Sequence, residues 1–230
     1  MEVSMTDKYK IYVPEEMKAR LINDAELFDF TKKDETINLN AFLKTLPINY
    51  FDQYRETKTQ LLNTILSDLS AFSSISNEDA NAIADKIINT YLYHREFKPG
   101  RNAAITLTVS GTSLEVMHAI ENNMLTRVSL SQYINDLLSS YLSLSRKDRE
   151  KIIFQDTFDK LHSAIGKNSI ITFSLISKPE FVFTIQPYLI AASKEEQFNY
   201  LLGMDNDSGL LRTFRISRIR SLYISSNKFT

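Results

Sequence analysis

Alternation of apolar and polar side chains marks two short stretches of the chain as strands. Residues 104–109 and residues 9–13 both alternate with a period of two, and the second stretch stops at Pro14. This pattern is typical of a half-buried strand. The inward positions are Ile11, Val13, Ile105, Leu107 and Val109. The outward positions are Lys8, Lys10, Tyr12, Ala104, Thr106 and Thr108.

The segments between and after these strands follow a helical period. Acidic residues beside Pro14 favour a helix start at Glu15, and Ser129 is in position to cap a later helix. Proline disrupts helix interiors, so Pro47 is expected to end or kink the helix that contains it. We expect helices over residues 15–30, 38–46, 50–72, 78–94, 112–123, 130–144 and 146–165.

Beyond Gly166 the chain changes to short β-rich runs separated by turn residues. Closely spaced strands of this kind favour a small barrel or sandwich. The expected strands cover residues 170–176, 181–185, 188–192, 198–204, 211–215 and 221–224. The predicted class is therefore α+β, with a mainly helical domain over residues 1–148 and a β-domain over residues 149–230.

Composition removes several classes of function. The 230 residues carry a net charge of −1, no cysteine, three dispersed histidines and five glycines. None of the glycines forms a phosphate-binding loop or a nucleophile elbow. We therefore expect no enzyme activity, no metal and no cofactor. The N-terminus does not resemble a signal peptide, and no apolar run approaches the roughly 18 residues of a membrane helix, so a cytoplasmic protein without membrane contact is expected.

One segment is strongly basic although the whole chain is nearly neutral. Residues 208–230 hold four arginines and a lysine and, after Asp207, no acid. Guanidinium groups bind phosphate in a bidentate manner and stack on bases, and Tyr200 offers an aromatic face. Strand parity places Arg212 and Arg218 opposite Arg215, so the three converge only if the chain turns after Arg215. The alternative is a set of solvated arginines that protects an edge strand from aggregation.

The order strand, helix, turn, helix over residues 103–144 resembles a ribbon-helix-helix protomer, and residues 8–46 repeat it more loosely. In that family two such strands form an antiparallel ribbon, so we expect residues 9–13 to pair with residues 104–109 within one chain or across a homodimer. Nucleic acid would then face Lys8, Lys10, Tyr12, Thr106 and Thr108. Threonine makes no bidentate contact with a base, which suggests a scaffold. The alternative is an unrelated helical domain with two incidental strands.

Three motifs in order resemble a WYL domain: FTIQPYL at 183–189, FNYLLG at 198–203 and RTFRISRI at 212–219. Asn199 stands where that family has tryptophan, and Ser217 where it usually has aspartate. The resemblance implies a small Sm-like barrel that binds nucleic acid or a nucleotide-type ligand. It places Tyr200, Arg212, Arg215 and Arg218 on the ligand surface, and Arg220 adds a further cation to the same segment.

Together the two segments resemble the accessory WYL proteins of type VI-D CRISPR systems. That resemblance implies a non-enzymatic regulatory protein that binds single-stranded RNA and assists an RNA-guided CRISPR effector ribonuclease. WYL transcription regulators, which bind DNA and sense a ligand through the barrel, are the alternative. A protein-interaction module without nucleic acid is the third class.

Overall fold

The computed structural model describes residues 6–72, 74–91, 102–124 and 129–229. Contacts within the chain divide it into two compact units, Met1–Leu144 and Ser145–Thr230. The first unit is mainly helical around a two-stranded ribbon, and the second is built on an antiparallel sheet. An α+β chain with a helical N-terminal region and a C-terminal sheet is therefore confirmed.

The ribbon of the N-terminal unit joins two segments that lie far apart in the sequence. Strands β1 (Thr6–Pro14) and β2 (Asn102–Ser110) are antiparallel, with Ile11 opposite Ile105 and Lys10 opposite Thr106. The predicted pairing of residues 9–13 with residues 104–109 is thus confirmed, and it forms within one chain. The alternation is confirmed as well, because the inward residues Ile11, Val13, Ile105, Leu107 and Val109 are all buried.

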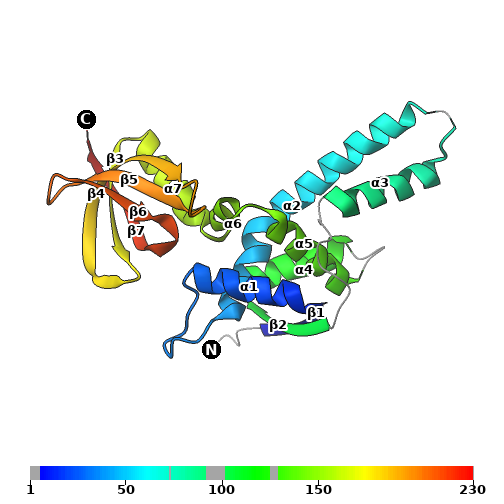
Figure 1. Cartoon of the computed structure of the whole chain (residues 1–230), viewed down its shortest axis with the longest axis horizontal. Helices are drawn as coiled ribbons and strands as arrows, with labels where there is room; N and C mark the ends of the chain where they lie inside the picture. Colours follow the sequence, from blue (N-terminus) through cyan, green and yellow to red (C-terminus); the bar gives the residue numbers. More distant parts are fainter. Residues whose placement is uncertain (1–5, 73, 92–101, 125–128, 230) are drawn as a thin grey trace. The chain divides into compact units, whose positions relative to one another are not determined.

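The described residues of this unit form five helices. They are α1 (Glu15–Leu27), α2 (Leu39–Ser70), α3 (Asn77–Tyr91), α4 (Thr112–Met124) and α5 (Leu130–Ser143). Of these, α1, α2, α4 and α5 contact the ribbon and α3 packs along α2 (Figure 1). Side chains of Asn38 and Ser129 cap α2 and α5 by accepting the backbone N–H of Ala41 and Gln132, which satisfies donors that a helix start otherwise leaves unpaired. The predicted residues 92–94 of the third long helix lie outside the described residues.

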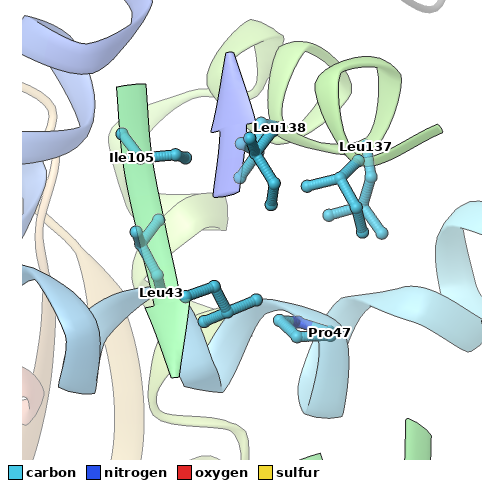
Figure 2. Close-up of a pocket in the computed structure, with 8 residues that line it drawn as sticks. Leu43, Pro47, Ile105, Leu137 and Leu138 are labelled. Atoms are coloured by element: carbon cyan, nitrogen blue, oxygen red, sulfur yellow. The ribbon is translucent and has the colours of Figure 1, made fainter. Parts of the chain in front are cut away.

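Pro47 does not end its helix, contrary to the expectation that two helices meet there. It lies inside the continuous helix α2 and is buried. Figure 2 shows why the position is tolerated: Pro47 and Leu43 on α2 face Leu137 and Leu138 on α5 across the core. The gap between them measures only about 10 Å³ and is lined by apolar groups. Burial of the ring in this core offsets the hydrogen bond that proline cannot donate.

Helix α2 contacts strand β2, and helix α5 contacts strand β1. The Asn40 amide on α2 donates to the carbonyl of Thr108 at 3.3 Å and accepts its N–H at 2.8 Å. On the opposite edge, Asn135 of α5 donates to the carbonyl of Tyr12 at 2.7 Å. Both edges of the ribbon thus carry side-chain partners for backbone groups that a two-stranded sheet leaves unpaired.

The C-terminal unit begins with two short helices, α6 (Arg146–Ile153) and α7 (Gln155–Gly166). A single helix over residues 146–165 was the wrong prediction. Phe154 ends α6 and precedes α7 in a non-helical conformation (φ −111°, ψ 30°). After the break, Phe158, Leu161 and Ala164 of α7 pack into the core formed by the sheet.

Five strands form one antiparallel sheet in the order β6-β5-β4-β3-β7. Their bounds are β3 Ser169–Leu175, β4 Lys178–Ala192, β5 Asn199–Asp205, β6 Leu211–Arg215 and β7 Ile219–Lys228. The expected strands 181–185 and 188–192 are one strand, because Pro187 is accommodated at a register shift against β5. Among the described residues no ladder joins β6 to β7, so the sheet is open where a closed barrel was expected.

The core of this unit is aromatic and aliphatic. Phe173, Phe183 and Phe214 pack with ring centroids 5.0–5.7 Å apart, and all three are buried. Among residues that the structure describes, every helix is too short or too polar to span a lipid bilayer.

Candidate nucleic-acid interface

An open pocket of about 350 Å³ in the C-terminal unit brings Tyr200, Arg215 and Arg218 together. Tyr200 comes from β5, Arg215 is the last residue of β6, and Arg218 ends the 3₁₀ helix that follows. The remaining lining residues are Leu175, Ser177, Glu196, Thr213 and Phe214. Two guanidinium groups and a phenol in one open concavity suit an anionic ligand with an aromatic part.

In a straight strand Arg215 and Arg218 would point to opposite faces, but a tight turn follows Arg215. β6 ends at Arg215, and residues Ile216–Arg218 form one 3₁₀ turn before β7 begins at Ile219. Ile216 and Ser217 are fully buried, while Arg218 is exposed. The chain therefore does turn after Arg215, which was the condition for convergence, and the turn allows Arg215 and Arg218, but not Arg212, to line the same pocket.

The Arg215 side chain is held by an aromatic ring and a hydroxyl. Its guanidinium carbon lies 3.3 Å from the centroid of the Phe198 ring, and its Nε donates to Ser217 Oγ at 2.7 Å. Arg146 also approaches Phe198, at 5.1 Å from the centroid. A cation over an aromatic face is attracted by the ring quadrupole, so the orientation of Arg215 is set before any ligand binds.

Tyr200 shares the pocket with a carboxylate. Its hydroxyl donates to Glu196 Oε2. That hydrogen bond, together with burial and the negative charge of Glu196, raises the pKa of Tyr200, and the nearby Arg215 only partly opposes the effect. Tyr200 is therefore protonated near neutral pH and acts as a hydrogen-bond donor and stacking surface. Glu196 also makes the pocket less positive than its two arginines alone would.

Arg212 and Arg220 lie apart from this pocket. Arg212 Nε forms an ion pair with Asp205 Oδ2 at 2.7 Å. Burial favours the neutral form of Asp205, but hydrogen bonds from Ser208 and the Asp207 N–H, with the charge of Arg212, outweigh it and lower its pKa. Arg220 donates to the carbonyls of Ser217 and Ile219 at 2.7 and 2.8 Å. Of the five predicted binding residues, the pocket brings together three.

The outward face of the ribbon is a second candidate surface, and it is asymmetric. Lys8, Lys10 and Tyr12 come from β1, opposite Thr108, Thr106 and Ala104 of β2. Tyr12 is 52% exposed, and the Lys10 ammonium lies 5.2 Å from its ring centroid. All the cations on this face therefore come from one strand, whereas Thr106 and Thr108 supply only hydroxyl and methyl groups.

Sequence reasoning missed Glu150, Phe198 and Ser217 as parts of the site. Phe198 and Ser217 orient Arg215, and buried Glu150 accepts hydrogen bonds from the segments on both sides of the pocket. Glu150 sits in a run of alternating acids and bases, which normally indicates a solvated helix face, so no sequence signal identified it. Within the described residues, no group of three or more His, Cys, Asp or Glu side chains has the arrangement of a metal site.

Comparisons with known proteins identify the C-terminal segment. Residues 156–224 match the family model of the WYL domain. A crystal structure described as that of a CRISPR Cas-related protein aligns with all of this chain at a TM-score of 0.56 and 18% identity. This chain covers 65% of that protein, slightly less than two thirds of its length. That likeness shows a shared fold.

A second solved structure, the proteasome accessory factor B/C of Arthrobacter aurescens, aligns with 96% of this chain and 35% of its own at 12% identity. Its TM-score of 0.30 is too low to carry an argument. No curated protein matches the sequence.

Proposed function

We propose that this chain, which carries a WYL domain over residues 156–224, is a non-enzymatic regulatory protein that binds single-stranded nucleic acid, RNA in preference to DNA. The observation that carries the proposal is the convergence of Tyr200, Arg215 and Arg218 on one open pocket. The guanidinium groups contact phosphates, and Tyr200 stacks on an unpaired base. The protein works in the cytoplasm without a cofactor.

Single strands are favoured over duplexes for a physical reason. A base is available for stacking only when it is unpaired, and stacking on an aromatic side chain contributes on the order of 1–3 kcal/mol per base. Tyr200 is half-buried at the pocket, so it can pack against a base that enters from solvent. A duplex presents only its phosphates to the same pocket.

The fold also supports a proposal about the protein partner. The strand-helix-helix segments 8–46 and 103–144 act as a ribbon-helix-helix-like scaffold, and the open C-terminal sheet is an Sm-like element. The likeness in fold to a structure described as CRISPR Cas-related supports an accessory role in which the RNA-bound protein modulates an RNA-guided effector ribonuclease, as a monomer or a homodimer.

The deciding experiment measures the affinity of the purified protein for labelled RNA, single-stranded DNA and duplex DNA of one sequence at one salt concentration. RNA binding that is at least tenfold tighter than duplex binding supports the proposal. Addition of the protein to the effector should then raise its RNA cleavage, and a variant that combines Arg215→Ala with Arg218→Ala should not. Equal affinity for the duplex, or no binding, would overturn it.

The ribbon favours a second candidate function, that of a DNA-binding regulator. It is antiparallel and intramolecular, and it presents Lys8, Lys10 and Tyr12 on one exposed face. Duplex preference that disappears when Lys8 and Lys10 are replaced with alanine, but persists in the Arg215 and Arg218 variants, would establish this function. Under the proposed RNA-binding function, replacing Thr106 and Thr108 should matter much less than replacing Arg215 and Arg218, and the opposite ranking would mean that the ribbon contacts the nucleic acid.

A further inference from the structure

Helix α6 contacts both chain segments that form the pocket, although none of its residues lines it. Arg146 donates to the carbonyl of Glu196 at 2.9 Å. The carbonyl of Lys147 accepts a hydrogen bond from the Asn199 amide at 2.7 Å. These contacts attach the N-terminal end of α6 to the loop and strand that carry Glu196 and Tyr200.

Glu150 makes the central connection. It is fully buried, and its Oε2 accepts the backbone N–H of Asn199 at 2.6 Å and the Asn199 side-chain amide at 2.9 Å. Its Oε1 accepts the backbone N–H of Ser217 at 3.1 Å. Asn199 directly precedes Tyr200, and Ser217 lies between Arg215 and Arg218. One carboxylate therefore connects the two segments that carry the ligand-facing side chains.

Only a carboxylate fits this arrangement. Burying an ionised group is unfavourable unless hydrogen bonds compensate for the lost water, and here three N–H donors converge on two acceptor oxygens. A glutamine in the same place has one acceptor oxygen and one donor NH₂ group. Its NH₂ would face the N–H of either Asn199 or Ser217, and one of the two segments would lose its partner.

We infer that Glu150 is a positioning residue that sets the Arg215–Arg218 turn relative to Tyr200 and couples occupancy of the pocket to the order of α6. The inference rests on the proposed function, because it concerns the same pocket. Coupling of this kind is reciprocal: a ligand that tightens the Asn199 and Ser217 segments also tightens α6.

The test uses the full chain and a labelled uridine oligonucleotide of ten residues as the probe. In the wild-type protein, the probe should slow hydrogen–deuterium exchange of the amides of residues 146–153. Glu150→Gln should weaken probe binding about tenfold and abolish that slowing. The dependence of affinity on salt should stay unchanged, because the phosphate contacts of Arg215 and Arg218 remain. The control Asp159→Asn removes an exposed carboxylate from α7 and should match the wild-type protein in all three measurements.

The possible failures are distinguishable. A wild-type protein that does not bind the probe overturns the proposed function. A wild-type protein that binds without any change in α6 exchange, or a Glu150→Gln variant that binds like the wild type, overturns this inference alone. If Glu150→Gln does not fold, Asn199→Ala provides the second variant, since it removes the bonds of the side-chain amide and keeps the buried charge. It should weaken binding and reduce the slowing of exchange in α6, and an unchanged response would contradict the inference.

Discussion

Arg212 Nε lies 2.7 Å from Asp205 Oδ2, and this ion pair holds Arg212 apart from the pocket that Arg215 and Arg218 line. The three arginines are spaced evenly in the sequence, three residues apart, yet they have different surroundings. Arg212 neutralises a buried carboxylate, whereas Arg215 and Arg218 line the open pocket. The basic segment thus contains cations with different roles.

This difference predicts a ranking of variants. Arg215→Ala and Arg218→Ala should each weaken RNA binding about tenfold or more, because hydrogen bonds to charged groups contribute roughly 1.5–3 kcal/mol. Arg212→Ala should weaken it only slightly. The double variant at Arg215 and Arg218 should also lower the slope of log affinity against log salt by about 1.4, at about 0.7 for each phosphate contact on a single strand.

Fluorescence anisotropy at several salt concentrations measures both quantities, and thermal unfolding shows whether each variant is folded. Arg212→Ala binding as weakly as the double variant would contradict the assignment of separate roles.

The lowered pKa of Asp205 predicts that the stability of the folded protein depends on pH. The folded pKa of Asp205 lies below the ordinary aspartate value of 3.8, so the unfolded chain binds the proton more tightly than the folded one. The contribution to stability is therefore present above pH 3.8 and is lost as the pH falls through the folded pKa. Asp205→Asn should lower the melting temperature at pH 7, and the difference from the wild type should shrink below pH 3.8.

Asp156→Asn is the matched control for this measurement. Asp156 pairs with Lys160 on the surface of α7 at 2.6 Å, with 79% of its side chain exposed. Exposed pairs of this kind contribute little to stability, so the substitution should leave the melting temperature nearly unchanged. A constant difference between Asp205→Asn and the wild type down to pH 2 would show that the carboxylate does not act through its ionisation.

The next prediction concerns Gly203, where the sheet leaves no room for a side chain. It is buried in β5, and a Cβ atom added there would lie 2.6 Å from the backbone oxygen of Gln186 and 2.5 Å from Ile185 Cγ2. Because backbone cannot move aside at low cost, Gly203→Ala should destabilise the C-terminal unit by about 1–3 kcal/mol. The control Gly166→Ala has no atom within 4 Å of the added Cβ and should be neutral. Urea unfolding of both variants tests this, and equal midpoints would contradict it.

Local patterns predicted much of the fold. A strand with one buried face alternates with a period of two, so Ile105, Leu107 and Val109 could be assigned to the inside from the sequence. Pro47 and Phe154 show where local patterns fail. A proline normally ends a helix, but its ring at position 47 packs in a core formed by distant residues of α5. At Phe154 no glycine or proline marks the break, which depends on packing against the sheet.

The binding site was predictable only in part. The motifs at 198–203 and 212–219 drew attention to Tyr200, Arg215 and Arg218, which line one pocket. Strand parity alone would have placed Arg215 and Arg218 on opposite faces, and the turn that brings them together was not predicted. The exclusion of Arg212 depends on Asp205, which approaches it only once β5 and β6 pair. Glu150 could not be identified from the sequence for a similar reason: the N–H groups that it binds, on Asn199 and Ser217, lie 49 and 67 residues away in the sequence.

Asn40 provides the last prediction, which concerns the ribbon. Its amide accepts the N–H of Thr108 and donates to the carbonyl of the same residue, as a third strand would at this edge. Asn40→Ala leaves both backbone groups of a half-buried residue without this partner, at a cost of about 1–3 kcal/mol. Hydrogen–deuterium exchange of residues 102–110 should accelerate, and the N-terminal unit should melt at a lower temperature. Asn81→Ala, which removes an exposed amide that donates to the carbonyl of Asn77 within α3, should change neither. Unchanged exchange in β2 of the Asn40→Ala protein would mean that the ribbon is held by its inward face alone.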